Sequence, residues 1–202
     1  MMKKYNINQT TLKILALYRD NYKISLHLRE IARRTKVDVK AVQLQLKRLE
    51  CANILSCALR GKNKEYYLNL NNVCVKYYMT MAEAFFTVNF IDKNFQIKKV
   101  ISEIGKKIDG IVLLFGSFAK GYATKESDID IFVITAKKFN KNTIDEVSMI
   151  IGRKISIKSS GKKQFLDGLK NADPLICEVA LGHVTLKGVD DFCDIMWDYY
   201  AR

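Results

Sequence analysis

Apolar residues recur at helical spacing through much of the first third of the chain. The spacing predicts a first helix that begins at a cap formed by Thr10 or Thr11. A short strand and two further helices are expected next, at residues 23–26, 27–35 and 39–51. His27 is expected to cap the second helix, and Asn53 to follow the third in a left-handed conformation. Alternation on both sides of Gly61 then predicts a β-hairpin with a basic tip, from strands at residues 54–60 and 65–70.

The rest of the chain mixes helices with short apolar runs. Aromatic and aliphatic residues at helical intervals predict long helices over residues 73–108. The runs 111–115 and 129–134 are too short for a first choice of helix and indicate buried strands. A further strand is expected at residues 154–158, and further helices at residues 143–151, 162–171, 174–180 and 189–200, around a short segment at residues 184–187. The predicted fold class is α+β, with a small mixed sheet flanked by helices.

Two carboxylates, Asp128 and Asp130, stand one residue apart where the second apolar run begins. Residues i and i+2 of a strand share one face, so both side chains are expected to converge. Unpaired negative charge beside an apolar strand is costly. Mg²⁺ relieves it, since this ion takes one or two carboxylates together with substrate phosphates. After the first run, Gly116-Ser117 and Gly121 suit a turn whose backbone N–H groups hold a triphosphate.

Charge is concentrated near the N-terminus. The chain has a formal net charge of +13, and residues 1–75, with 15 Lys and Arg against 5 Asp and Glu, carry +10 of it. Clustered cations favour a polyanionic partner through counterion release, and solubility alone is the alternative interpretation. Five cysteines without a C-x-x-C pair and only two histidines support neither a disulfide framework nor a zinc site. Without a long apolar segment or a signal peptide, the protein is expected in the cytoplasm and not in a membrane.

The segment from Gly116 to Asp130 combines Gly-Ser, a gap of ten residues and Asp-Ile-Asp. It resembles the signature of the DNA polymerase β-like nucleotidyltransferases, in particular the minimal prokaryotic ones. The resemblance implies transfer of a nucleoside monophosphate, AMP from ATP as first choice, with Mg²⁺ or Mn²⁺ as cofactor. It implies a catalytic and metal-binding role for Asp128 and Asp130. The residues that it implies for nucleotide binding are Gly116, Ser117, Lys120 and Gly121.

The chain departs from this family's pattern on the next strand. The family has a third carboxylate there, which completes one metal site and helps to deprotonate the acceptor. This chain has Ser156, between Ile155 and Ile157. A hydroxyl is a poor ligand for Mg²⁺ and no base near neutral pH. Transfer is then slow, takes its base from elsewhere, with Glu178 as one candidate, or is absent.

Residues 8–72 resemble a winged helix-turn-helix domain in the order of their helices and basic hairpin, most clearly in the phrase LKRLECANIL at residues 46–55. The resemblance implies that the third helix enters a major groove of double-stranded DNA. The implied base or phosphate contacts are Lys40, Gln43 and Lys47, and the implied backbone contacts are Arg33, Arg34, Lys62 and Lys64. Leu44 lies where such helices often carry a polar reader, and it suits a thymine methyl or a protein partner. A protein-interaction module is the alternative to DNA binding.

The expected organisation has three parts. Residues 1–72 form the winged helix domain, residues 73–91 a helical connector and residues 92–202 the nucleotidyltransferase-like domain. Connector aromatics are expected to bury against these domains or against a second subunit, which makes a homodimer an option. The first hypothesis is an active transferase of the kind that includes autoregulating antitoxins, which modify a small helical HEPN-type toxin. The second is a DNA-binding transcriptional regulator whose transferase domain binds nucleotide or a partner without catalysis.

Overall fold

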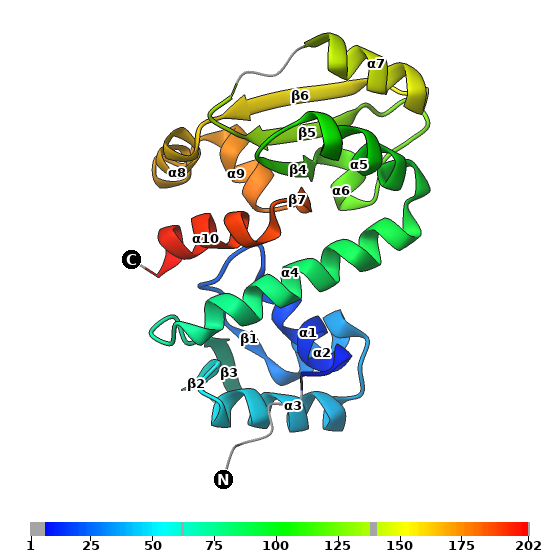
Figure 1. Cartoon of the computed structure of the whole chain (residues 1–202). Coiled ribbons are helices and arrows are strands. Elements are labelled where there is room, and N and C mark those ends of the chain that lie inside the picture. Colours follow the sequence, from blue (N-terminus) through cyan, green and yellow to red (C-terminus); the bar gives the residue numbers. More distant parts are fainter. Residues whose placement is uncertain (1–6, 62, 138–140, 202) are drawn as a thin grey trace. The chain divides into compact units, whose positions relative to one another are not determined.

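The computed structural model describes residues 7–61, 63–137 and 141–201 (Figure 1). The chain divides into two compact units, Met1–Phe85 with Tyr200–Arg202, and Phe86–Tyr199. Lys62, one of the predicted DNA contacts, lies outside the described residues. In the described part of the chain, no helix is both long enough and apolar enough to cross a bilayer.

The first unit combines short helices with a three-stranded antiparallel sheet. Its elements are α1 (Gln9–Leu15), the 3-10 turn η1 (Ala16–Tyr18), β1 (Leu26–His27), α2 (Leu28–Thr35), α3 (Val39–Cys51), β2 (Leu55–Arg60), β3 (Asn63–Leu68) and the first part of α4 (Cys74–Lys93). The strand order is β1-β3-β2. The predicted hairpin is confirmed, and its second strand begins earlier than expected, at Asn63, because Asn63 already pairs with Arg60.

Local capping explains where the first helices begin and end. The predicted cap at Thr10 or Thr11 is wrong: Asn8 caps α1, and its Oδ1 accepts from Thr11 N at 2.9 Å. The Thr11 hydroxyl is instead buried and bonds Gln45 of α3 at 3.2 Å. The expected strand at residues 23–26 is also displaced, to Leu26–His27. His27 does cap α2, by accepting from Glu30 N, and Asn53 has the predicted left-handed φ of 59°.

The core of the first unit holds a buried ion pair beside its apolar side chains. Tyr18 is fully buried, and its hydroxyl donates to the carbonyl of Tyr66 at 2.9 Å. Burial raises the pKa of that hydroxyl far above its usual range. Arg19 donates from Nε and Nη2 to the two carboxylate oxygens of Glu83 in α4, at 2.8 and 2.9 Å. This two-pronged pair fixes η1 on α4 within the unit, since it satisfies both buried charges.

The second unit is built on a four-stranded mixed sheet. Its elements are α5 (Phe95–Lys107), β4 (Ile111–Phe115), α6 (Gly116–Lys120), β5 (Ile129–Ile134), α7 (Lys141–Ile151), β6 (Ile155–Ser160), α8 (Lys162–Lys170), α9 (Pro174–Ala180), β7 (Val184–Lys187) and α10 (Val189–Tyr200). The strand order is β6-β5-β4-β7, with β5 and β6 parallel and the other pairs antiparallel. The α+β class with a small mixed sheet is therefore confirmed for this unit.

Helices cover both faces of this sheet, and strand alternation decides which residues meet them (Figure 1). Ile131 and Val133 of β5 join a buried cluster with residues of α5 and α7. Phe132, between them, points to the other face and contacts Phe165 of α8 at 5.7 Å between ring centroids. Asp130 has the same parity as Phe132, so it lies on the face covered by α8, α9 and α10.

Candidate active site

The candidate site lies where β4 ends and where β5 and β6 begin. Phe115, the last residue of β4, pairs with Asp130 in β5, and Asp130 pairs with Ser156 in β6. Three neighbouring strands therefore bring Gly116, Asp130 and Ser156 together. Ser156 stands beside Asp130, the position at which the sequence pattern expects the third carboxylate.

Gly116 makes room for the Asp130 carboxylate. Its φ is +68°, and a Cβ at this position would lie 2.5 Å from Oδ2 of Asp130. A side chain here would thus be strained by the left-handed backbone and would collide with the carboxylate. The glycine is required by the close approach of the Asp130 side chain to the end of β4.

The electrostatics of the site are those of two carboxylates that repel each other. Burial first, and then the charge of Asp128, raise the pKa of Asp130 above its usual value; Glu178 acts in the same direction. A hydrogen bond from Ser156 and the charge of Lys158 act against this shift. Asp128 accepts from Lys154 Nζ at 2.8 Å, and that bond raises the pKa of Lys154. This repulsion agrees with the prediction that the side chains of Asp128 and Asp130 lie close together.

The donor set fits a divalent cation that shares its coordination with a substrate. In the described ranges, no three or more His, Cys, Asp or Glu side chains are grouped so that they could hold a metal by themselves. Asp128 and Asp130 carry the negative charge, and Ser156 adds only a neutral hydroxyl. Mg²⁺ commonly binds through one or two carboxylates with phosphates and water filling the other positions. The pair therefore suits a metal that arrives with a phosphorylated substrate.

The predicted glycine-serine turn is the start of a short helix. Gly116 and Ser117 open α6, which ends at Gly121 with a φ of +79°. The amide of Tyr122 donates back to the carbonyl of Ser117 at 3.1 Å, which closes the turn. The positive φ of Gly116 turns the chain at the end of β4, and the following residues, Ser117–Lys120, then continue as a helix. Lys120, predicted as a phosphate contact, forms an ion pair with Glu178 at 3.0 Å.

Arg153 and Lys154 are contributors to the site whose roles were not predicted. Arg153 Nη1 donates to the carbonyls of Thr124 and Ser127, at 2.9 and 2.8 Å. Its guanidinium lies 5.1 Å from the ring centroid of Phe118 in α6. It therefore joins the start of β6 to the loop that leads into Asp128. The sequence does show a basic pair before an apolar run. Sequence spacing, however, does not indicate which carbonyl groups a guanidinium will contact.

Several predicted DNA contacts share one exposed surface of the first unit. Lys40, Gln43 and Lys47 are exposed on α3, together with Leu44, whose exposed fraction is 50%. Their spacing of three and four residues puts them on one side of the helix. Arg33 and Arg34 are exposed on α2. Lys64 is already engaged, because its Nζ lies 3.0 Å from Glu50 Oε2.

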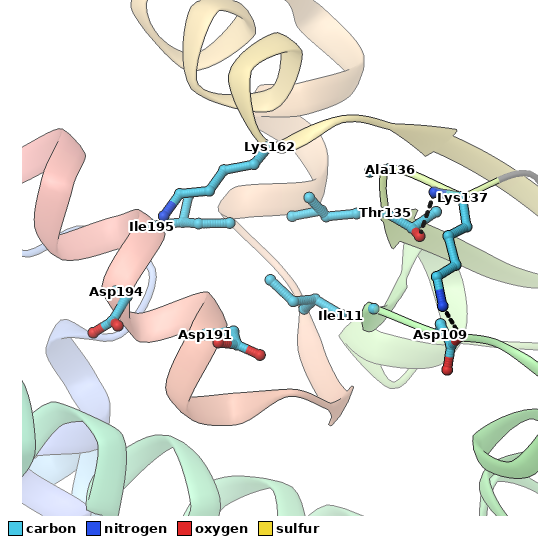
Figure 2. A pocket seen from close by; sticks show the side chains of 11 residues that line it. Asp109, Ile111, Thr135, Ala136, Lys137, Lys162, Asp191, Asp194 and Ile195 are labelled. Atoms are coloured by element: carbon cyan, nitrogen blue, oxygen red, sulfur yellow. Dashed lines mark hydrogen bonds and ion pairs between the residues drawn. The ribbon is translucent and has the colours of Figure 1, made fainter.

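A cleft at the opposite end of β4 and β5 is a different kind of site (Figure 2). It has a volume of about 370 Å³ and an apolar floor that includes Ile111 and Ile134. Its rim carries three carboxylates and two ammonium groups, from Asp109, Asp191, Asp194, Lys137 and Lys162. Asp109 and Lys137 form an ion pair at 2.8 Å. This excess of carboxylates disfavours a polyphosphate, so the cleft does not replace the site at Asp128 and Asp130.

Comparison with known proteins agrees with the geometry of the second unit. Residues 89–186 match the sequence profile of the family described as "Polymerase beta, Nucleotidyltransferase". The matched segment is similar to a polymerase β-like nucleotidyltransferase domain, and the Asp-x-Asp strand lies inside it.

Two individual proteins show narrower similarity. A 60-residue segment is 37% identical to the CCA-adding enzyme of Picrophilus torridus, and the match covers 29% of this chain and 14% of that enzyme. A crystal structure of a toxin-antitoxin with AMP-PNP aligns with 15% identity and a TM-score of 0.37, over 50% of this chain and 80% of that one.

Proposed function

We propose that the second unit transfers a nucleoside monophosphate, AMP from ATP as the first choice, to a protein or another acceptor. The observation that carries the proposal is the repelling pair Asp128 and Asp130, placed beside Gly116-Ser117 in a nucleotidyltransferase-like domain. Among the described residues, Asp128 is paired with the ammonium group of Lys154, which carries a single positive charge. A divalent cation offsets the charge of the two carboxylates and takes phosphate oxygens of a triphosphate in its remaining positions.

The chain's own residues divide the work of binding and positioning. Asp128 and Asp130 would hold Mg²⁺ or Mn²⁺, which supplies charge neutralisation and polarisation of the phosphate when bound. Ser117 and the amides at the start of α6 would contact the phosphates, with Lys120 and Gly121 at the end of that helix. Ser156 orients Asp130 by hydrogen bonding. Glu178 is the next carboxylate that acts on Asp130 and is the first candidate for the acceptor's base.

We further propose that the first unit is a winged helix that binds double-stranded DNA. Its support is the exposed row of Lys40, Gln43 and Lys47 on α3, in the part of the chain that carries most of the positive charge. Arg33 and Arg34 would contact the phosphate backbone. A cytoplasmic autoregulating antitoxin, with a helical HEPN-type toxin as acceptor and a homodimer on DNA, fits this combination.

The direct test is transfer from α-labelled ATP, with Mg²⁺ and candidate acceptors that include a co-expressed helical partner. Wild-type protein should label an acceptor, and Ser156→Asp should label it faster because an acid is restored beside Asp130. Labelling that survives both Asp128→Asn and Asp130→Asn would place the chemistry elsewhere. No label with wild-type protein and none with Ser156→Asp would refute transfer.

One observation favours a second function. Ser156 in place of a carboxylate leaves two acids at the site, and a hydroxyl cannot act as base near neutral pH. Under this alternative the protein is a transcriptional regulator whose second unit binds nucleotide without turnover. Metal-dependent nucleotide binding, lost in Asp130→Asn but never followed by labelling, would identify this case.

A further inference from the structure

The first unit has a cavity of about 490 Å³ on its hairpin, separate from the exposed row on α3. Its walls come from the segment that precedes β1, from β2 and β3, and from the residues after β3. Ser56 and Tyr67, which both line it, lie opposite each other in the register of the hairpin. Its volume lies in the range of about 300–1,000 Å³ typical of small-molecule sites.

The charge of this cavity has one sign. Lys23 and Arg60 line it, and no carboxylate does among the residues that the structure describes. Lys23 is exposed, and no ion pair of its ammonium group occurs among the described residues. Arg60 Nε lies 3.5 Å from Oε2 of Glu65, a long ion pair. The cavity therefore favours an anionic group, unlike the carboxylate-rich cleft of the second unit.

The other walls suit a planar ring and its polar edge. Tyr67 is half-buried and lines the cavity with its neighbour Leu68. Tyr22 is buried and is fixed by stacking on Tyr200 with 5.1 Å between ring centroids. Ser25, Ser56 and Asn71 supply hydroxyl and amide groups at the same walls. Base stacking on an aromatic side chain, together with a cation for the phosphate, is a general way to bind nucleotides.

We propose that this cavity is a second, metal-independent binding site for a mononucleotide, an aromatic base that carries a phosphate. The ring would lie against Tyr67, and the phosphate near Lys23 and Arg60. Neither Asp128 nor Asp130 takes part, and Lys40, Gln43 and Lys47 do not line the cavity. A mononucleotide bound here would act as an effector of the first unit and not as a substrate.

The experiment is calorimetric titration of the full chain with AMP in EDTA, so that metal-dependent binding in the second unit is silent. Wild-type protein should bind, and Asp130→Asn should bind equally well. Lys23→Glu and Tyr67→Ala should each weaken binding by about tenfold or more, the size of one stacking or phosphate contact. Tyr67→Phe, which keeps the ring, should retain binding. Arg29→Glu, an equal charge change at an exposed position of α2 outside the cavity, should leave the affinity unchanged.

Four outcomes of these titrations would overturn the proposal. Absence of AMP binding in EDTA refutes it directly, even if Mg²⁺-dependent binding at the aspartates is found. Equal affinity for inorganic phosphate refutes the ring contact, and equal losses with Lys23→Glu and Arg29→Glu show a general charge effect. Loss of AMP binding in Asp130→Asn assigns the nucleotide to the second unit alone. Conversely, a second unit with no transfer activity leaves the expected titration result unchanged.

Discussion

The two units present their candidate residues in opposite ways. In the second unit, Gly116 directly follows β4, and Asp130 and Ser156 lie on β5 and β6, so the hydrogen-bond register of these three strands fixes the residues beside each other. In the first unit, Lys40, Gln43 and Lys47 are solvated side chains on one helix. A site built from strands has a defined geometry without its ligand. A row of exposed polar and cationic side chains becomes a site only when a partner orders it, so charge alone does not specify the partner.

The largest expected effect concerns the strand-built site. Asp130→Asn should lower metal-dependent nucleotide binding or transfer by at least about 100-fold, a typical loss for a group that stabilises reacting charge. The fold should be unharmed, because the pKa of Asp130 is already raised by burial and by Asp128. Asp145→Asn, an exposed carboxylate on α7, is the matched control and should change neither property. Equal activity in the two variants would remove Asp130 from the site.

The next effect separates buried charges from exposed ones within the first unit. Arg19→Met should cost about 3–5 kcal/mol of unfolding free energy, since it leaves the carboxylate of Glu83 buried without its main partner. Lys64→Met breaks the pair with Glu50 at a half-exposed position and should cost less than about 1 kcal/mol. Chemical denaturation of both variants measures the difference. Similar costs would show that burial of the Arg19–Glu83 pair has no energetic weight.

A smaller loss of stability should follow Gly116→Ala. A left-handed alanine costs about 1–2 kcal/mol, and contact with the Asp130 carboxylate adds to it. Gly121→Ala is a close control, because Gly121 also has a positive φ but faces open space. Thermal unfolding should show the greater loss at Gly116. If the two variants lose equally, the approach of Gly116 to Asp130 does not constrain the strands.

The smallest effect is expected on the exposed row. Lys47→Ala should reduce the slope of log affinity against log salt by about 0.9 for each DNA phosphate that the lysine neutralises, and should weaken all DNA sequences alike. Gln43→Ala should instead change the preference between sequences. Electrophoretic or fluorescence titrations at several salt concentrations measure both. Salt-dependent DNA binding that survives removal of residues 1–72 would assign it to the second unit.

Much of the fold was predictable because its signals are local. The runs 111–115 and 129–134 are bounded by glycine or by carboxylates, and both are strands as expected. The bounds of α3, α9 and α10 agree with prediction, and Asp173 caps α9 by accepting from Ile176 N at 2.9 Å. The cap of α1 was missed because Thr11 bonds Gln45, a partner 34 residues away in the chain.

The site was only partly predictable for the same reason. The spacing of Asp128 and Asp130 indicated a shared face, since that follows from strand geometry alone. The ion pairs of Lys120 with Glu178 and of Lys154 with Asp128 depend on which elements become neighbours. No periodicity in a single sequence carries that information.

The bridge made by Arg153 gives the ten-residue interval between Ser117 and Asp128 a physical basis. The guanidinium of Arg153 bonds to the carbonyls of Thr124 and Ser127 and lies against the ring of Phe118. It therefore contacts both the helix that precedes the loop and the last part of the loop. Loss of a single residue between positions 124 and 127 would present a different pair of carbonyls to this guanidinium and would displace Asp128 relative to Ser117. An added residue between Gly121 and Thr124, in an exposed part of the loop, would leave the two hydrogen bonds of Arg153 intact. The length of the loop is therefore constrained between residues 124 and 127 and tolerant of insertion between residues 121 and 124.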